Sequence, residues 1–217
     1  MDFLDIVGQL SRGVGYTLMV TLVSSLTGVA VGLTVAGLRR LRVPGVATLL
    51  DLFTYFFRSV PVLVLLFMMY FGLPSVAIKV PPLAAMALSL GLVAGAYLAE
   101  VFRGALEAVD GAEILAARAM GLGRLQVFAY IELPQMLRFA VPGMVNEFTS
   151  ILKYSPFAYT VGIPEITKQA MTLTSTTLQG VEIYLAVGVL YFAIYRILLV
   201  GVRLIEKRYR VPGMVLS

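Results

Sequence analysis

Seven side chains that can carry a charge or form a hydrogen bond lie close together in an otherwise apolar part of the chain. Within ten residues these are Asn146, Glu147, Thr149, Ser150, Lys153, Tyr154 and Ser155. Glu147 and Lys153 are six positions apart, so on a helix they are not the i,i+4 neighbours that form ion pairs. Each charge therefore needs another partner, a water-filled cavity or a ligand, and this stretch is the first candidate for a functional site.

The residue types present limit the chemistry that the chain can perform. It has no His and no Cys, which excludes Ser-His catalysis, thiol nucleophiles, disulfides and His-based zinc sites. The P-loop pattern G-x-x-x-x-G-K-[ST] is absent. Ser150 and Lys153 have i,i+3 spacing, so an enzyme with a Ser-Lys dyad is an alternative hypothesis. Apart from that alternative, we expect no catalytic residue, no metal site and no cofactor in this chain.

The composition is that of an integral membrane protein. Of the 217 residues, 59% are hydrophobic and only 13% are charged, whereas soluble domains have roughly 45–50% apolar and about 25% charged residues. A hydrocarbon core needs about 20 apolar residues per helix. Five stretches meet or approach this length, so we expect an all-α membrane protein with a single domain, residues 1–217. The expected spans are Val14–Leu38, Phe53–Phe71, Leu83–Phe102, the more polar Phe139–Val161, and Ile183–Val202.

Basic residues predict the orientation of these spans. Most of them border the same side, namely Arg39, Arg40, Arg42, Arg58, Arg103, Arg118, Arg124, Arg138, Arg203, Lys207, Arg208 and Arg210. The opposite side has only Arg12, Lys79 and Lys168. By the positive-inside rule the N-terminus lies outside and the C-terminus in the cytoplasm. This distribution explains the net charge of +5 without nucleic acid, and we interpret Arg58 as an interfacial anchor.

Small residues and prolines modify the expected spans. Gly28 with Gly32, and Gly91 with Gly95, have GxxxG spacing, which permits close helix approach. We favour packing within the chain over a dimer seam for these glycines. Pro61 lies inside the second expected span and predicts a kink or break there.

The longest polar connection, residues 109–133, predicts a short amphipathic helix at Ala112–Met120 that ends at Gly121. Such a helix either lies against its own protein or enters a groove of a partner, and periodicity does not distinguish the two. Ala116 and Ala117, three residues, Gly121, nine residues, and then Ile131-x-Leu133-Pro134 resemble the EAA loop of ATP-binding-cassette (ABC) importer permeases. The leading Glu of that motif aligns with Leu115, and Glu113 lies two residues earlier.

Other segments resemble the polar amino acid permeases, which include the histidine, glutamine and arginine importers. The matching stretches are 57–61 (FRSVP), 70–74 (YFGLP), 95–104 (GAYLAEVFRG), 146–153 (NEFTSILK) and 161–165 (VGIPE). The resemblance implies the type I ABC importer fold, with five transmembrane helices and a cytoplasmic coupling helix. It implies transport of polar amino acids by alternating access, with ATP and Mg²⁺ bound by partner subunits.

The resemblance also implies the partners and the location. They are an ATPase dimer, a second permease chain that is identical or homologous, and a periplasmic or lipid-anchored binding protein, in a bacterial inner membrane. Contact with the ATPase is expected at Glu113, Ala116, Ala117, Gly121 and Leu122.

The resemblance places substrate at the polar span. The carboxylate of an amino acid suits Lys153, and its ammonium suits Glu147 or Glu100, with Tyr154 and Ser155 beside them. Tyr154 occupies the position of the family's Asp, which is expected to bind the amino group. Either the substrate is bound differently, or this chain is the non-binding half of a heterodimer. Glu100 also has an internal partner in Arg103, at i,i+3. A channel or stand-alone transporter is the remaining alternative, and the sequence does not identify the amino acid carried.

Overall fold

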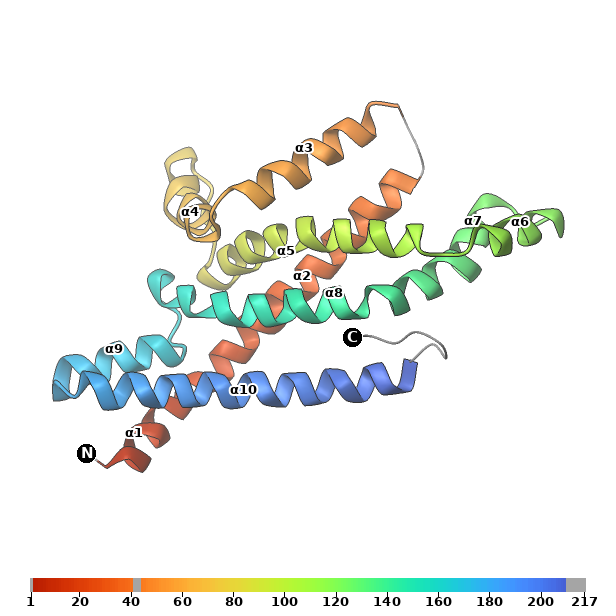
Figure 1. Ribbon diagram of the computed structural model, residues 1–217. Coiled ribbons are helices and arrows are strands. Elements are labelled where there is room, and N and C mark those ends of the chain that lie inside the picture. The colour runs from red at the N-terminus through yellow and green to blue at the C-terminus, as the bar shows by residue number, and fades with distance from the viewer. Residues whose placement is uncertain (1, 41–43, 210–217) are drawn as a thin grey trace.

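The computed structural model describes residues 2–40 and 44–209, with side chains through Val202. The described chain consists of helices and connecting turns, and no strand occurs within it (Figure 1). Arg42 and Arg210, which contributed to the predicted orientation, lie outside the described residues. The α-helices are α1 (Phe3–Leu10), α2 (Val14–Arg40), α3 (Val46–Ser59), α4 (Val62–Phe67), α5 (Pro82–Glu107), α6 (Gly111–Ala119), α7 (Arg124–Val127), α8 (Leu133–Tyr154), α9 (Ile166–Thr177) and α10 (Gly180–Tyr209). Short helical turns of other types are η1 (Ser11–Gly13), η2 (Met68–Gly72), η3 (Leu73–Val76), η4 (Phe128–Glu132) and η5 (Ser155–Val161).

Helix α5 is the centre of the bundle and contacts α2, α3, α4 and α8. Its close packing on α2 depends on glycine. A Cβ atom added at Gly91 would lie 2.6 Å from Thr27, and one at Gly95 would lie 2.6 Å from Val31. These contacts confirm that the GxxxG pairs serve packing within the chain. They also make α2 and α5 a rigid frame for the other helices.

Three continuous helical segments are long and apolar enough to cross a membrane: Phe3–Arg40, Pro82–Glu107 and Gly180–Val202. They contain or overlap the first, third and fifth expected spans. The fourth expected span corresponds to α8 and η5. These helices are too polar to be identified as a membrane span by length and composition. The number of crossings therefore stays a prediction.

The second expected span, Phe53–Phe71, is broken at Pro61, one of the two outcomes that the sequence predicted. α3 ends at Ser59, and the chain bends by 101° before it continues from Val62. Pro61 has no N–H to donate, and Val60 before it adopts an extended conformation with φ −88° and ψ 130°. Proline was expected to kink or break this span, and the structure shows a break.

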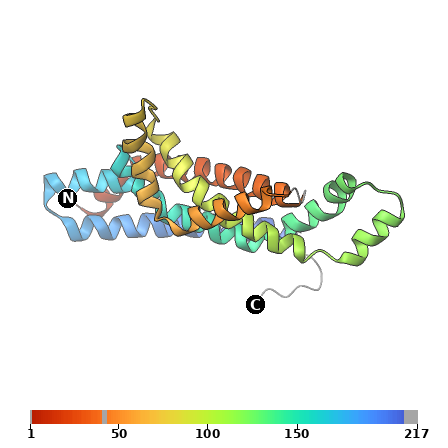
Figure 2. The ribbon, with the colours of Figure 1, turned by 90° about the horizontal axis from the view of Figure 1, so that it is seen from above.

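One end of the bundle carries a segment that extends beyond the other helices (Figures 1 and 2). This projecting segment consists of α6, α7 and η4, residues 111–132. Asp110 caps α6 by accepting a hydrogen bond from the backbone N–H of Ala112 at 2.9 Å. The helix covers 111–119 where 112–120 was expected, so the predicted amphipathic helix is present with a shift of one residue.

Gly121 ends α6 as the sequence predicted. It has φ +88°, a left-handed conformation that glycine adopts without strain. Its N–H donates to the carbonyl of Arg118 at 2.9 Å, and the N–H of Leu122 donates to that of Ala117 at 3.1 Å. This pair of bonds is the Schellman arrangement, which satisfies the last carbonyls of a helix.

Candidate functional site

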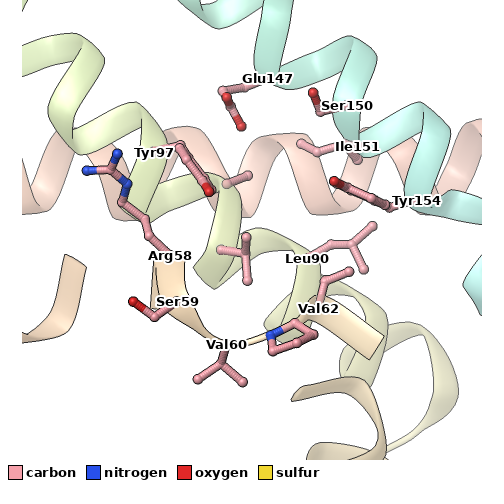
Figure 3. A pocket seen from close by; sticks show the side chains of 13 residues that line it. Arg58, Ser59, Val60, Val62, Leu90, Tyr97, Glu147, Ser150, Ile151 and Tyr154 are labelled. Atoms are coloured by element: carbon pink, nitrogen blue, oxygen red, sulfur yellow. The ribbon is translucent and has the colours of Figure 1, made fainter. Parts of the chain in front are cut away.

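A pocket of about 400 Å³ opens between the break in the second span and helices α5 and α8 (Figure 3). It is lined by Arg58, Ser59, Val60, Pro61, Val62, Leu90, Val93, Ala94, Tyr97, Glu147, Ser150, Ile151 and Tyr154. The residues on both sides of the break at Pro61 form one wall of the pocket. The volume lies in the range of about 300–1,000 Å³ that is typical of small-molecule sites.

Opposite charges face this pocket from different elements. Arg58, in the last turn of α3, places its guanidinium 4.9 Å from the centre of the Tyr97 ring on α5. Glu147 projects from α8 on the facing side and interacts electrostatically with Arg58 (Figure 3). No ion pair joins Glu147 to any other described residue. The pocket thus offers a cation and an anion in a largely apolar enclosure.

Tyr154 and Ser150 complete the polar lining on the α8 side. The ring of Tyr154 stacks on Phe157, with 6.0 Å between the ring centres, and its side chain borders the pocket (Figure 3). Ser150 donates a hydrogen bond to the carbonyl of Asn146 at 2.9 Å, which leaves the lone pairs of its hydroxyl oxygen as acceptors. Glu147, Ser150 and Tyr154 share one face of α8 because they are three and four residues apart.

The structure does not place Lys153 in the same pocket. Its side chain lines a second cavity of about 370 Å³ between α8, η5 and α10, together with Leu152, Pro156, Tyr191, Phe192 and Tyr195. The Lys153 amine lies 5.9 Å from the centre of the Tyr195 ring, a cation–π distance. Lys153 and Glu147 are on different faces of α8, as their spacing predicted.

Glu100 and Ser155 also lie outside the pocket. Glu100 accepts from Arg39 at 2.5 Å and from Arg103 at 2.9 Å, so its charge is already paired within the chain. The internal pair with Arg103 that the sequence suggested is present. Ser155 is fully buried, and its hydroxyl donates to the carbonyl of Leu152 at 2.8 Å. Of the five predicted substrate residues, the structure brings Glu147 and Tyr154 together.

Arg58 is the pocket residue that sequence reasoning missed, because it was interpreted as an interfacial anchor. Arg58 lies in the last turn of α3, just before the break at Pro61, and borders the pocket together with Tyr97 and Glu147. These neighbours come from α5 and α8, so no local sequence pattern signalled this position.

The residues expected to contact a partner lie on the projecting segment, and most are exposed. Ala116, Gly121 and Glu113 are exposed, Leu122 is half-buried and Ala117 is buried. Glu113 accepts a hydrogen bond from Gln135 at 2.5 Å, which fixes it against α8. Large apolar side chains are exposed on the same segment, namely Leu115 (68%), Met120 (82%), Leu125 (76%) and Tyr130 (73%). Exposed apolar surface of this kind is typical of protein or membrane contacts.

A helical bundle with membrane-length helices, a largely apolar pocket that holds a charge of each sign, and an exposed apolar projection fits a membrane transport subunit. The chain belongs to the family of binding-protein-dependent transport system inner membrane components, whose model matches residues 28–211.

Relatives and solved structures agree with this assignment. The probable amino-acid ABC transporter permease protein YckA of Bacillus subtilis is 31% identical over 91% of this chain and 88% of its own length. The probable glutamine ABC transporter permease protein GlnP of Bacillus subtilis is 32% identical over 96% and 99%. The crystal structure of an amino acid ABC transporter with histidines has a TM-score of 0.85 and 28% identity, covering 96% of this chain and 99% of that chain. An inward-facing MetNI methionine ABC transporter has the same fold, with a TM-score of 0.78 and 24% identity over 93% and 96%.

Proposed function

We propose that this chain is the membrane-spanning subunit of an ATP-driven importer of polar amino acids that works by alternating access. The observation that carries the proposal is the pocket between the break at Pro61 and α8, which presents Arg58 and Glu147 from facing elements. The names of the relatives YckA and GlnP, both amino-acid ABC permeases, support the same substrate class.

An amino acid zwitterion matches the charges of this pocket. The guanidinium of Arg58 suits the substrate carboxylate, because it can donate two parallel hydrogen bonds. The carboxylate of Glu147 suits the ammonium group. Tyr154, which stands where the family has Asp, offers a hydroxyl as an additional hydrogen-bond partner. Binding substrate replaces the long-range attraction between Arg58 and Glu147 with two shorter contacts.

Lys153 keeps its predicted role as a second candidate for the carboxylate. It lies on the neighbouring face of α8, so the two cavities are separated by the helix itself. Ser155 and Glu100 remain predictions of lower priority, because both side chains are already hydrogen-bonded within the chain.

A second candidate function is the non-binding half of a heterodimeric importer. The substitution of Tyr154 for the family's Asp favours it, because a tyrosine supplies no carboxylate at that position. In that case the partner permease carries the site, and Arg58 and Glu147 form an internal contact across an empty pocket.

The projecting segment is proposed as the contact with an ATPase dimer, which binds ATP and Mg²⁺ and performs hydrolysis. Its exposed residues Leu115 and Met120 would enter a groove on the ATPase, with Ala116 and Gly121 close to that surface. A second permease chain and a binding protein complete the assembly. The ATPase moves the permease only if it binds the two permease conformations with different affinity.

We further propose a bacterial inner membrane location with the N-terminus outside and the projecting segment in the cytoplasm. The concentration of Arg residues on one side supports this orientation. The chain has no Cys, so a single Cys introduced at Met120 or at Leu178 is the only thiol. An impermeant maleimide added to whole cells should label Cys at position 178 and not Cys at position 120. The reverse pattern would contradict the orientation.

The transport role is tested by purifying the chain with its ATPase and measuring ATP hydrolysis in proteoliposomes across a panel of amino acids. Hydrolysis should rise with a polar amino acid and its binding protein. Glu147→Gln should raise the substrate concentration needed for half-maximal uptake about tenfold or more. Glu107→Gln, an exposed control, should not. Two results together would favour the hypothesis that this chain is the non-binding half of a heterodimer. Uptake would be unchanged in Glu147→Gln, and uptake would be lost after a substitution in a different partner permease.

A further inference from the structure

A third pocket, of about 420 Å³, lies where α2 ends beside the projecting segment and is not used by the transport pathway proposed above. It is lined by Gly37, Arg40, Arg118, Arg124, Leu125, Val127, Phe128 and Glu132. Three of these residues are cationic and one is anionic.

The charges in this pocket are not balanced. Arg40 donates to both carboxylate oxygens of Glu132, so this pair is neutral. The guanidinium groups of Arg118 and Arg124 form no ion pair or hydrogen bond with any residue that the structure describes. The lining therefore has two uncompensated positive charges directed at one cavity, which favours an anion with about two negative oxygens to share.

The other half of the lining is apolar, and the pocket lies at the end of a membrane-length helix. Val127 is buried, Phe128 is half-buried, and Leu125 is 76% exposed. Arg40 is the last residue of α2. An occupant must therefore combine an anionic group with apolar chains and must be available at the membrane boundary. Basic pockets in this position on the cytoplasmic side of helical membrane proteins suit phospholipid head groups.

We propose that this pocket binds the phosphate of an anionic phospholipid from the cytoplasmic leaflet, with Arg118 and Arg124 as the phosphate ligands. The lipid would link the end of α2 to the projecting segment, beside the ion pair of Arg40 and Glu132. The leaflet follows from the proposed orientation, which the maleimide labelling above tests separately.

The test is native mass spectrometry of the purified importer complex, titrated with phosphatidylglycerol or with phosphatidylcholine of the same acyl chains. The wild-type complex should retain phosphatidylglycerol at a concentration at least about tenfold lower than the R118Q/R124Q variant. Wild type and R118Q/R124Q should retain phosphatidylcholine at similar concentrations. The R118K/R124K variant keeps the charges and should recover most of the binding. Arg12→Gln, an exposed arginine at the other end of the bundle, is the matched control and should bind as the wild type does.

Three results would overturn the proposal. Equal retention of phosphatidylglycerol by wild type and R118Q/R124Q would show that these arginines do not bind it. Loss of the ATPase from the R118Q/R124Q complex with unchanged lipid retention would assign the arginines to the ATPase contact. Full displacement of phosphatidylglycerol by millimolar inorganic phosphate would show that the pocket binds a free anion and that the acyl chains do not contribute to binding.

Discussion

Arg40, the last residue of α2, donates from Nε and Nη2 to the two carboxylate oxygens of Glu132, the last residue of the projecting segment. The residue Glu132 is only 3% exposed, so this two-point contact is largely shielded from water. The preceding residue, Arg39, contacts Asp51 on α3 and Glu100 on α5. Two adjacent arginines therefore join the end of α2 to the bundle on one side and to the projecting segment on the other.

Removing the charge of Glu132 should loosen the projecting segment. Glu132→Gln leaves Arg40 without its carboxylate and should lower the free energy of unfolding by about 1–3 kcal/mol. This is less than for a fully buried pair, because the Arg40 side chain is 35% exposed. Thermal unfolding of the complex and substrate-stimulated ATP hydrolysis are the measurements. Glu107→Gln, which breaks an exposed pair with Arg103, should change the free energy of unfolding by less than about 1 kcal/mol. An E132Q variant as stable and as well stimulated as the wild type would refute the linking role.

Replacing Gly121 should disturb the end of α6. Gly121→Arg introduces a Cβ at φ +88°, which costs about 1–2 kcal/mol locally, and adds a long charged chain at the expected ATPase contact. Uptake should fall while the subunit still reaches the membrane. Gly111→Arg is the matched control, because Gly111 begins the helix that Gly121 follows, has open space around it and lacks a positive φ. Normal uptake in G121R would count against the docking role of this turn.

Enlarging Gly95 should separate α2 from α5. Gly95→Val brings a side chain within 2.6 Å of Val31 and should lower stability by about 1–3 kcal/mol. Gly104→Val on the same helix meets nothing within 4 Å and should be tolerated. The two variants are compared by thermal unfolding in detergent. Equal melting temperatures would show that the α2–α5 contact is not as tight as the structure has it.

Lys153→Ala should affect either substrate recognition or folding. The Lys153 amine contacts the Tyr195 ring and has no carboxylate partner among the described residues, so its charge is uncompensated in this chain alone. Weaker substrate affinity with normal stability would support a pathway role. A lower melting temperature with normal affinity would support a contact with α10 or with a second permease chain. Measured affinity and stability that both match the wild type would reject both roles.

The features predicted from sequence are those set by local physics. Gly121 ends a helix because the left-handed turn favours glycine. The long apolar runs of α2, α5 and α10 are visible in composition alone. Glu147 and Tyr154 were predicted to share one site because charged side chains inside a membrane segment raise its insertion free energy and therefore need a partner or a ligand.

The features that were not predicted depend on contacts between distant segments. A break at Pro61 was predicted, but the size of its bend, 101°, was not, and neither was the packing of α4 on α5 beyond it. Arg58 borders the pocket through contacts with distant segments, such as that with Tyr97 on α5. Glu100 was proposed as a substrate ligand, yet its strongest partner is Arg39, 61 residues away, which no local pattern reveals.

The most direct test of the account is photo-crosslinking from the projecting segment. A photoreactive residue in place of Met120, which is 82% exposed, should form an adduct with the ATPase subunit in assembled complexes. Leu178 is 88% exposed and lies in the turn between α9 and α10, at the end of the bundle opposite the projecting segment (Figure 1). The same photoreactive residue in place of Leu178 should form no adduct with the ATPase. An adduct with the ATPase from position 178 and none from position 120 would contradict the proposed coupling of this segment to ATP hydrolysis.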